Sequence, residues 1–214
     1  MSNFPPQLLS GYQNFMSGRY DTERDRYHYL ADSGQKPEVL VVACCDSRAA
    51  PETVFDCGPG ELFVVRNVAN LVPPYAPDGA FHSTSAALEF AVQSLRVKHI
   101  VVMGHGRCGG ITAALAPASE PLSPGDFIGH WMSMLAPLTE EIQHTHSLTA
   151  SERQIALERI SIRNSVTNLL TFPCIRILNE RGKLHLHGAW FDISTGELWV
   201  MDGKTGDFSR PETS

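Results

Sequence analysis

The sequence predicts an α/β fold: a central, mostly parallel sheet with an added antiparallel strand, helices on both faces and an N-terminal helical arm. Three short apolar runs rich in β-branched residues, at 39–43, 62–65 and 99–103, indicate buried strands. Between the last two runs, residues 83–95 place apolar side chains at helical spacing. A strand–helix–strand order implies a right-handed crossover between parallel strands.

The other segments complete this order. Helical spacing extends over 7–33, 109–117 and 126–170, the last with interruptions near Pro137 and Ser147. Strand patterns occupy 184–193 and 198–201, joined by a turn at 194–196. We therefore expect a helical arm over residues 1–35, an α/β domain over 36–205 and a loose, polar tail over 206–214.

Composition limits the class of protein. The 214 residues are 43% hydrophobic and 19% charged, which is typical of a folded chain of about one domain. The net charge of −6 argues against a nucleic-acid-binding face. No apolar run approaches the roughly 18 residues of a membrane span, and the first 20 residues lack the pattern of a secretory signal. We therefore expect a cytoplasmic protein, in which five cysteines serve as metal ligands, nucleophiles or core residues.

Candidate ligands follow two of the predicted strands. Cys44 ends the first run, and His105 and Cys108 follow the third. Because ligands bind at the carboxyl ends of parallel strands, these three side chains are expected to converge. Two thiolates and one imidazole form a known catalytic zinc set that leaves a fourth position for water. Taken alone, the His-x-x-Cys spacing is a weak signal, and residue type by itself favours small core cysteines and a strand-end histidine bonded to backbone.

The neighbouring residues favour the metal site. Two glycines and a predicted helix start follow Cys108, and helix N-termini stabilise thiolates. Asp46 lies two residues after Cys44, and Arg48 two residues further on. A carboxylate there would orient a bound water and accept its proton, and the guanidinium would keep Asp46 ionised.

Cys44-x-Asp-Ser-Arg48 followed by His105-x-x-Cys108 resembles the β-class carbonic anhydrases. The resemblance covers roughly residues 5–203. Further stretches that match the family are 63–67, 73–75, 86–90, 99–105, 163–166, 168–173 and 186–188.

This resemblance implies a zinc lyase that hydrates CO2 reversibly to bicarbonate and a proton through zinc hydroxide. One zinc per chain would be held by Cys44, His105 and Cys108, with Asp46 and Arg48 as the orienting dyad. The substrate pocket of the plant-like branch would correspond to Gln35, Phe63 and Phe81, the last standing where that branch has a tyrosine. The family also implies a homodimer or larger homo-oligomer, with the site at the subunit interface and Gln35 supplied by the neighbour.

Two alternatives remain open at this stage. The same scaffold would also suit hydrolysis of a related small electrophile, carbon disulfide or carbonyl sulfide. A non-enzymatic zinc or redox module built on Cys44, Cys45 and Cys108 would instead have four protein ligands and a closed site.

The resemblance also bears on regulation. Some bacterial members close their site at low pH, with bicarbonate in a side pocket built from a tryptophan, a glycine and an arginine. The corresponding residues here are Val41, Ala43 and Arg66, of which only the arginine matches. We therefore expect Arg66 to donate to backbone carbonyls and Asp46 to stay paired with Arg48.

Overall fold

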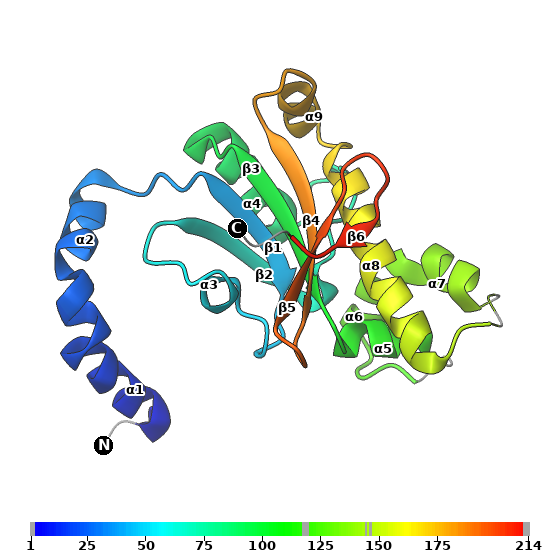
Figure 1. Cartoon of the computed structure of the whole chain (residues 1–214), viewed down its shortest axis with the longest axis horizontal. Helices are drawn as coiled ribbons and strands as arrows, with labels where there is room; N and C mark the ends of the chain where they lie inside the picture. The colour runs from blue at the N-terminus through cyan, green and yellow to red at the C-terminus, as the bar shows by residue number, and fades with distance from the viewer. Residues whose placement is uncertain (1–2, 117–119, 144, 146, 212–214) are drawn as a thin grey trace.

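The computed structural model describes residues 3–116, 120–143, 145 and 147–211. Its centre is a six-stranded sheet with the order β2-β1-β3-β4-β5-β6 (Figure 1). The strands are β1 (Val39–Cys44), β2 (Leu62–Asn67), β3 (His99–His105), β4 (His185–Asp192), β5 (Glu197–Met201) and β6 (Phe208–Ser209). The first four are parallel, and β5 and β6 continue the sheet antiparallel. The predicted sheet is thus confirmed.

One face of the sheet carries the main core. The crossover helix α4 (Ser83–Glu89) continues into the π-helical turn η2 (Phe90–Leu95), and it packs there beside α8 (Ala150–Leu169) and α9 (Pro173–Glu180). The core side chains from β1 and β3 on this face are Leu40, Val42, Ile100 and Val102. On the opposite face, Val54 of the short helix α3 (Pro51–Val54) and the adjacent Phe55 pack against Val41, Ala43 and Met103.

A second, smaller core forms where β1 and β3 end. It gathers α5 (Gly109–Leu115), α6 (Phe127–Met132), η3 (Ser133–Leu135), α7 (Ala136–Gln143), the start of α8 and the turn η1 (Val68–Asn70). These elements surround the carboxyl ends of the strands, where ligands bind in open parallel sheets.

The N-terminal arm extends away from the sheet (Figure 1). Its helices are α1 (Pro6–Ser17) and α2 (Arg19–Ser33), and no residue of either is buried. Arg26 ties α2 to the loop before β2, donating to the Pro59 carbonyl at 2.7 Å and pairing with Glu61 at 3.2 Å. Within the described residues, α1 makes no comparable hydrogen bond or ion pair to the body of the protein.

The C-terminus differs from expectation. Instead of a loose tail from residue 206, Phe208 and Ser209 pair with β5, and Arg210 forms an ion pair with Glu197 at 2.6 Å. Residues 212–214 of that predicted tail lie outside the described part. Within that part, no helix is both long and apolar enough to cross a membrane.

Candidate metal centre

The topology brings three candidate ligands to one point. Cys44 is the last residue of β1, His105 is the last residue of β3, and Cys108 precedes α5. Since β1 and β3 are adjacent and parallel, both strands deliver their last residues to the same edge of the sheet. The ligand atoms of Cys44, His105 and Cys108 all lie within 4.8 Å of one another, and all three residues are buried. We call these three residues the ligand cluster.

The donor atoms of the ligand cluster fit a zinc ion. His105 Nδ1 donates to the Gly106 carbonyl at 2.9 Å, which leaves the Nε2 lone pair free. This buried Nε2 has no hydrogen-bond partner among the described residues, a costly situation that a bound cation would relieve. Sulfur and imidazole nitrogen are ligands that zinc prefers in proteins.

The two thiols influence each other. Their sulfurs lie 4.0 Å apart. The contact lowers the pKa of Cys44 and raises that of Cys108, because the first thiolate formed accepts a hydrogen bond from the remaining thiol. A cation between the sulfurs would favour the loss of both protons.

Asp46 and Arg48 form a bidentate pair beside the ligand cluster. Arg48 donates from Nε to Oδ1 at 2.9 Å and from Nη2 to Oδ2 at 2.7 Å, and these bonds hold the pKa of Asp46 well below its ordinary value. Asp46 Oδ2 lies 3.7 Å from His105 Nε2. Arg48 Nη2 also donates to the Arg107 carbonyl at 3.2 Å, which joins the loop after β1 to the loop after β3.

Arg66 is a donor to backbone, as predicted. Its Nε donates to the Cys44 carbonyl at 2.8 Å, and its Nη2 donates to the Asp46 carbonyl at 2.7 Å. The guanidinium therefore fixes the backbone on both sides of Cys45.

Two of the expected pocket residues lie away from the ligand cluster of their own chain. Gln35 precedes β1 whereas Cys44 ends it, and at ~3.3 Å per residue the strand alone separates them by roughly 17 Å. Phe63 pairs in register with Leu40, also near the start of the strands. The structure therefore does not join Gln35 and Phe63 to the ligand cluster within one chain.

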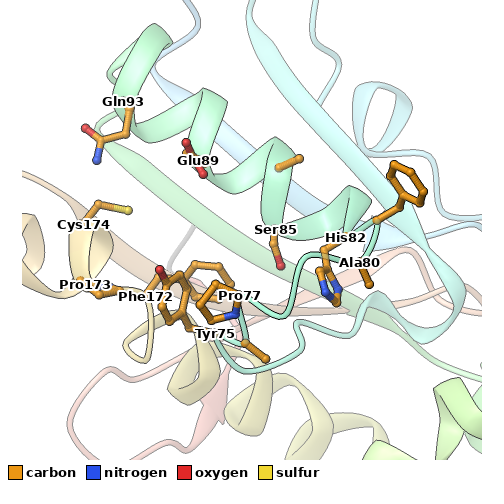
Figure 2. A pocket seen from close by; sticks show the side chains of 13 residues that line it. Tyr75, Pro77, Ala80, His82, Ser85, Glu89, Gln93, Phe172, Pro173 and Cys174 are labelled. Atoms are coloured by element: carbon orange, nitrogen blue, oxygen red, sulfur yellow. The ribbon is translucent and has the colours of Figure 1, made fainter.

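Phe81, the third expected pocket residue, lines a pocket that is separate from the ligand cluster. Its side chain is fully exposed, and it lines a pocket of about 610 Å³ to which no member of the ligand cluster contributes. Figure 2 shows this pocket between Tyr75 and Phe172 on one side and Glu89 of α4 and Gln93 of η2 on the other. The motifs alone carried no information on where Phe81 sits.

The aromatic ring that contacts Phe63 is Phe90, with centroids 5.9 Å apart. Phe90 was not singled out from the sequence, although it ends the matching stretch 86–90 and its helical spacing from Ala86 and Ala87 was visible. Its exposed fraction of 48% leaves the ring available to a neighbouring molecule.

Comparison with known proteins agrees with this geometry. A family model described as carbonic anhydrase matches residues 39–198. Beta carbonic anhydrase 3 of Arabidopsis thaliana is 36% identical over 204 residues, which are 93% of this chain and 78% of the Arabidopsis protein. Chloroplastic beta carbonic anhydrase 5 of the same plant is 39% identical over 191 residues, 88% of this chain and 62% of the relative.

Solved structures share the fold. The β-carbonic anhydrase CcaA superposes with a TM-score of 0.88 at 31% identity, covering 97% of this chain and 92% of CcaA. One of two tetrameric β-carbonic anhydrases from Sordaria macrospora gives a TM-score of 0.77 at 30% identity, with 95% and 97% covered. Since the matched region contains the ligand cluster and both strands that build it, this chain belongs to the β class of carbonic anhydrases, zinc enzymes that interconvert CO2 and bicarbonate.

Proposed function

We propose that the ligand cluster is the catalytic centre for reversible CO2 hydration and that Asp46 and Arg48 are its orienting dyad. The observation that carries this proposal is the buried Nε2 of His105, which has no hydrogen-bond partner in the described part of the chain and lies beside two thiols, with a carboxylate oxygen 3.7 Å away. Cys44, His105 and Cys108 would hold the zinc ion, which would act as a Lewis acid and lower the pKa of a water molecule.

The dyad has a distinct task. Because Arg48 binds both carboxylate oxygens, Asp46 is fixed in rotation and remains an acceptor. A water molecule at the remaining ligand position would donate one O–H to Asp46 Oδ2, and a lone pair of its oxygen would then point away from the carboxylate. Asp46 thus orients the nucleophile toward a CO2 molecule on the opposite side.

We further propose that the active enzyme is a homodimer or a larger homo-oligomer. The arm exposes a row of large apolar side chains, Leu8, Leu9, Tyr12 and Met16, which a second subunit would bury. The separation of Gln35 and Phe63 from their own ligand cluster supports a role for both in the neighbouring subunit's pocket. Phe90, which contacts Phe63, is better placed than Phe81 to complete that aromatic wall.

We also propose a reducing compartment, with the cytoplasm as the simplest choice. All five cysteines are free thiols in the structure, which is typical of proteins kept in such compartments.

Stopped-flow measurement of CO2 hydration tests the function. The purified zinc-loaded protein should hydrate CO2, chelation should abolish the activity, and added zinc should restore it. Carbon disulfide and carbonyl sulfide are assayed in parallel. Hydrolysis of either compound without CO2 hydration would favour the alternative substrate, and a zinc-loaded protein inactive on all three would contradict an enzymatic role.

A further inference from the structure

A buried carboxylate lies directly behind the ligand cluster. Glu158 projects from α8 and is only 2% exposed. Its Oε1 accepts from the Cys108 backbone N–H at 3.0 Å and from Gln154 Nε2 at 3.0 Å. Its Oε2 accepts from Trp190 Nε1, also at 3.0 Å. In each of these three hydrogen bonds, a nitrogen donates to a carboxylate oxygen of Glu158.

This arrangement suits an ionised carboxylate and disfavours its amide analogue. Three donors converge on two oxygens, and a carboxylate accepts at both. Burial raises the pKa of Glu158, whereas the hydrogen bonds from Cys108, Trp190 and Gln154 lower it and thus favour the carboxylate. A glutamine in its place would turn an NH2 group toward at least one N–H, leaving two buried donors face to face.

Glu158 reaches both sides of the loop that carries the ligands. It binds the Cys108 N–H directly, and it holds the indole of Trp190 on the other side. That indole packs under Gly106, where an added Cβ would lie 3.1 Å from Trp190 Cζ2. The Gly106 carbonyl in turn accepts from His105 Nδ1 and fixes the orientation of the imidazole. One carboxylate is thus linked to two members of the ligand cluster through separate chains of contacts.

We propose that Glu158 is a positioning residue for the metal: it sets the backbone of Cys108 and, through Trp190 and Gly106, the ring of His105, so that both ligand atoms meet the same ion. This inference rests on the proposed zinc function. It assigns to α8 a part in metal affinity that neither the ligand set nor the Asp46–Arg48 dyad accounts for.

The test is the zinc dissociation constant, measured by competition with a chromophoric chelator. Glu158→Gln should weaken zinc binding by about 10- to 100-fold, the usual effect of losing an outer partner of a metal ligand. With cobalt(II) in place of zinc, the thiolate charge-transfer and d–d absorption bands of E158Q should shift, because Cys108 is displaced. A wild-type protein that binds no zinc would refute the proposed function; wild-type affinity and spectra in E158Q would refute this inference alone.

Two further variants separate positioning from general packing. Gln154→Leu removes one donor to Glu158 without touching Cys108, so its zinc affinity should stay within about threefold of the wild type. Adding Trp190→Phe to E158Q removes the indole N–H that would face the glutamine NH2. The loss of zinc affinity in the double variant should therefore be smaller than the two single-variant losses multiplied together. Equal losses in Q154L and E158Q, or strictly additive effects in the double variant, would overturn the proposal.

If E158Q does not fold, Glu158→Asp is measured in the same way. It keeps the charge but is one methylene too short to reach both Cys108 and Trp190. Zinc affinity equal to that of the wild type in E158D would overturn the proposal.

Discussion

Cys108 combines three roles in one residue. Its sulfur lies 4.0 Å from Cys44 Sγ, its N–H binds Glu158, and its carbonyl accepts from the Thr112 N–H in the first turn of α5. The side chain is therefore held by backbone contacts on both sides before any metal arrives. Because these contacts are made by the backbone, the Cys108 sulfur can be replaced while the loop keeps its conformation.

Replacing Cys108 by serine should remove most of the zinc and nearly all hydration activity, because a hydroxyl is a poor substitute for a thiolate ligand. Elemental analysis and stopped-flow assays measure both quantities. Cys45→Ser is the matched control, since that neighbouring thiol is exposed, and it should keep both. A C108S protein with a full complement of zinc would exclude Cys108 as a ligand.

Asp46 should act as an ion throughout the working pH range. Arg48 holds its pKa well below the ordinary value, so Asp46 stays charged above about pH 4. Asp46→Asn should lower kcat/KM for CO2 hydration by about 10- to 100-fold. The pH at which activity falls to half on the acid side of the pH–activity profile should not change. Asp78→Asn, a surface carboxylate paired with His82, serves as the control. If the activity of D46N no longer fell at acid pH, the titrating group in the wild type would be Asp46 itself.

The same shift has a consequence for folding. A carboxyl with a lower pKa in the folded than in the unfolded state stabilises the fold above its unfolded pKa, about 3.9. This contribution is lost as the pH falls further toward the folded value. The free energy of unfolding should therefore depend on Asp46 above pH 4 and become independent of it in stronger acid.

The spacing of residues in the sequence predicted the metal ligands, because only a few residue types can bind zinc. Cys44, His105 and Cys108 stand at the ends of strands that their own hydrophobic runs reveal, so their convergence was predictable. Glu158 was not, because a glutamate within a helical pattern is normally a solvated residue. Its burial follows only from how α8 lies across the sheet.

At the scale of elements, α8 begins with a reciprocal capping box. Glu152 N–H donates to Thr149 Oγ1 at 3.3 Å, and Thr149 N–H donates to Glu152 Oε2 at 2.8 Å. Both bonds satisfy N–H groups that the first turn would otherwise leave open. The helix that carries Glu158 is thus fixed at its start.

Thr149→Ala should lower the free energy of unfolding by about 1 kcal/mol, measured by urea denaturation of the zinc-loaded protein. Thr149→Ser keeps the capping oxygen and should lose much less. Equal destabilisation by alanine and serine would mean that the methyl group matters more than the cap.

Local pattern predicted the elements whose side chains face a core and failed at the edge of the sheet. β1, β2 and β3 follow directly from their apolar runs. β6 is only two residues long, and it is held by pairing with β5 and by the Arg210–Glu197 ion pair across 13 positions. No local composition marks such a strand, so a loose tail was the natural expectation.

At the scale of the whole molecule, the N-terminal arm is the part that packs least on its own chain, since no residue of α1 or α2 is buried. Only α2 is anchored to the body in the described structure, while α1 presents Leu8, Leu9 and Tyr12 to solvent. Large apolar side chains that lie together on an exposed helix mark a contact surface.

Deleting residues 1–17 should reduce the assembly to smaller species and lower the hydration activity, because α1 no longer covers the neighbouring subunit. Sedimentation velocity and stopped-flow assays follow the two effects. Deleting only residues 1–3, which keeps Pro5 as the N-cap of α1 and as the acceptor for Leu8 and Leu9, should leave both unchanged. A fully active monomer lacking 1–17 would contradict the proposed assembly.

The distance between Gln35 and Cys44 along β1 has a genetic consequence. If Gln35 completes the pocket of the neighbouring subunit, each site is encoded by two chains. A chain with Cys108→Ser and a chain with Gln35→Ala are then defective in different halves of the site. Unfolded together and reassembled, they should form mixed oligomers in which one site regains both intact halves. The mixture should be more active than the average of the separate variants, which is the signature of complementation between alleles.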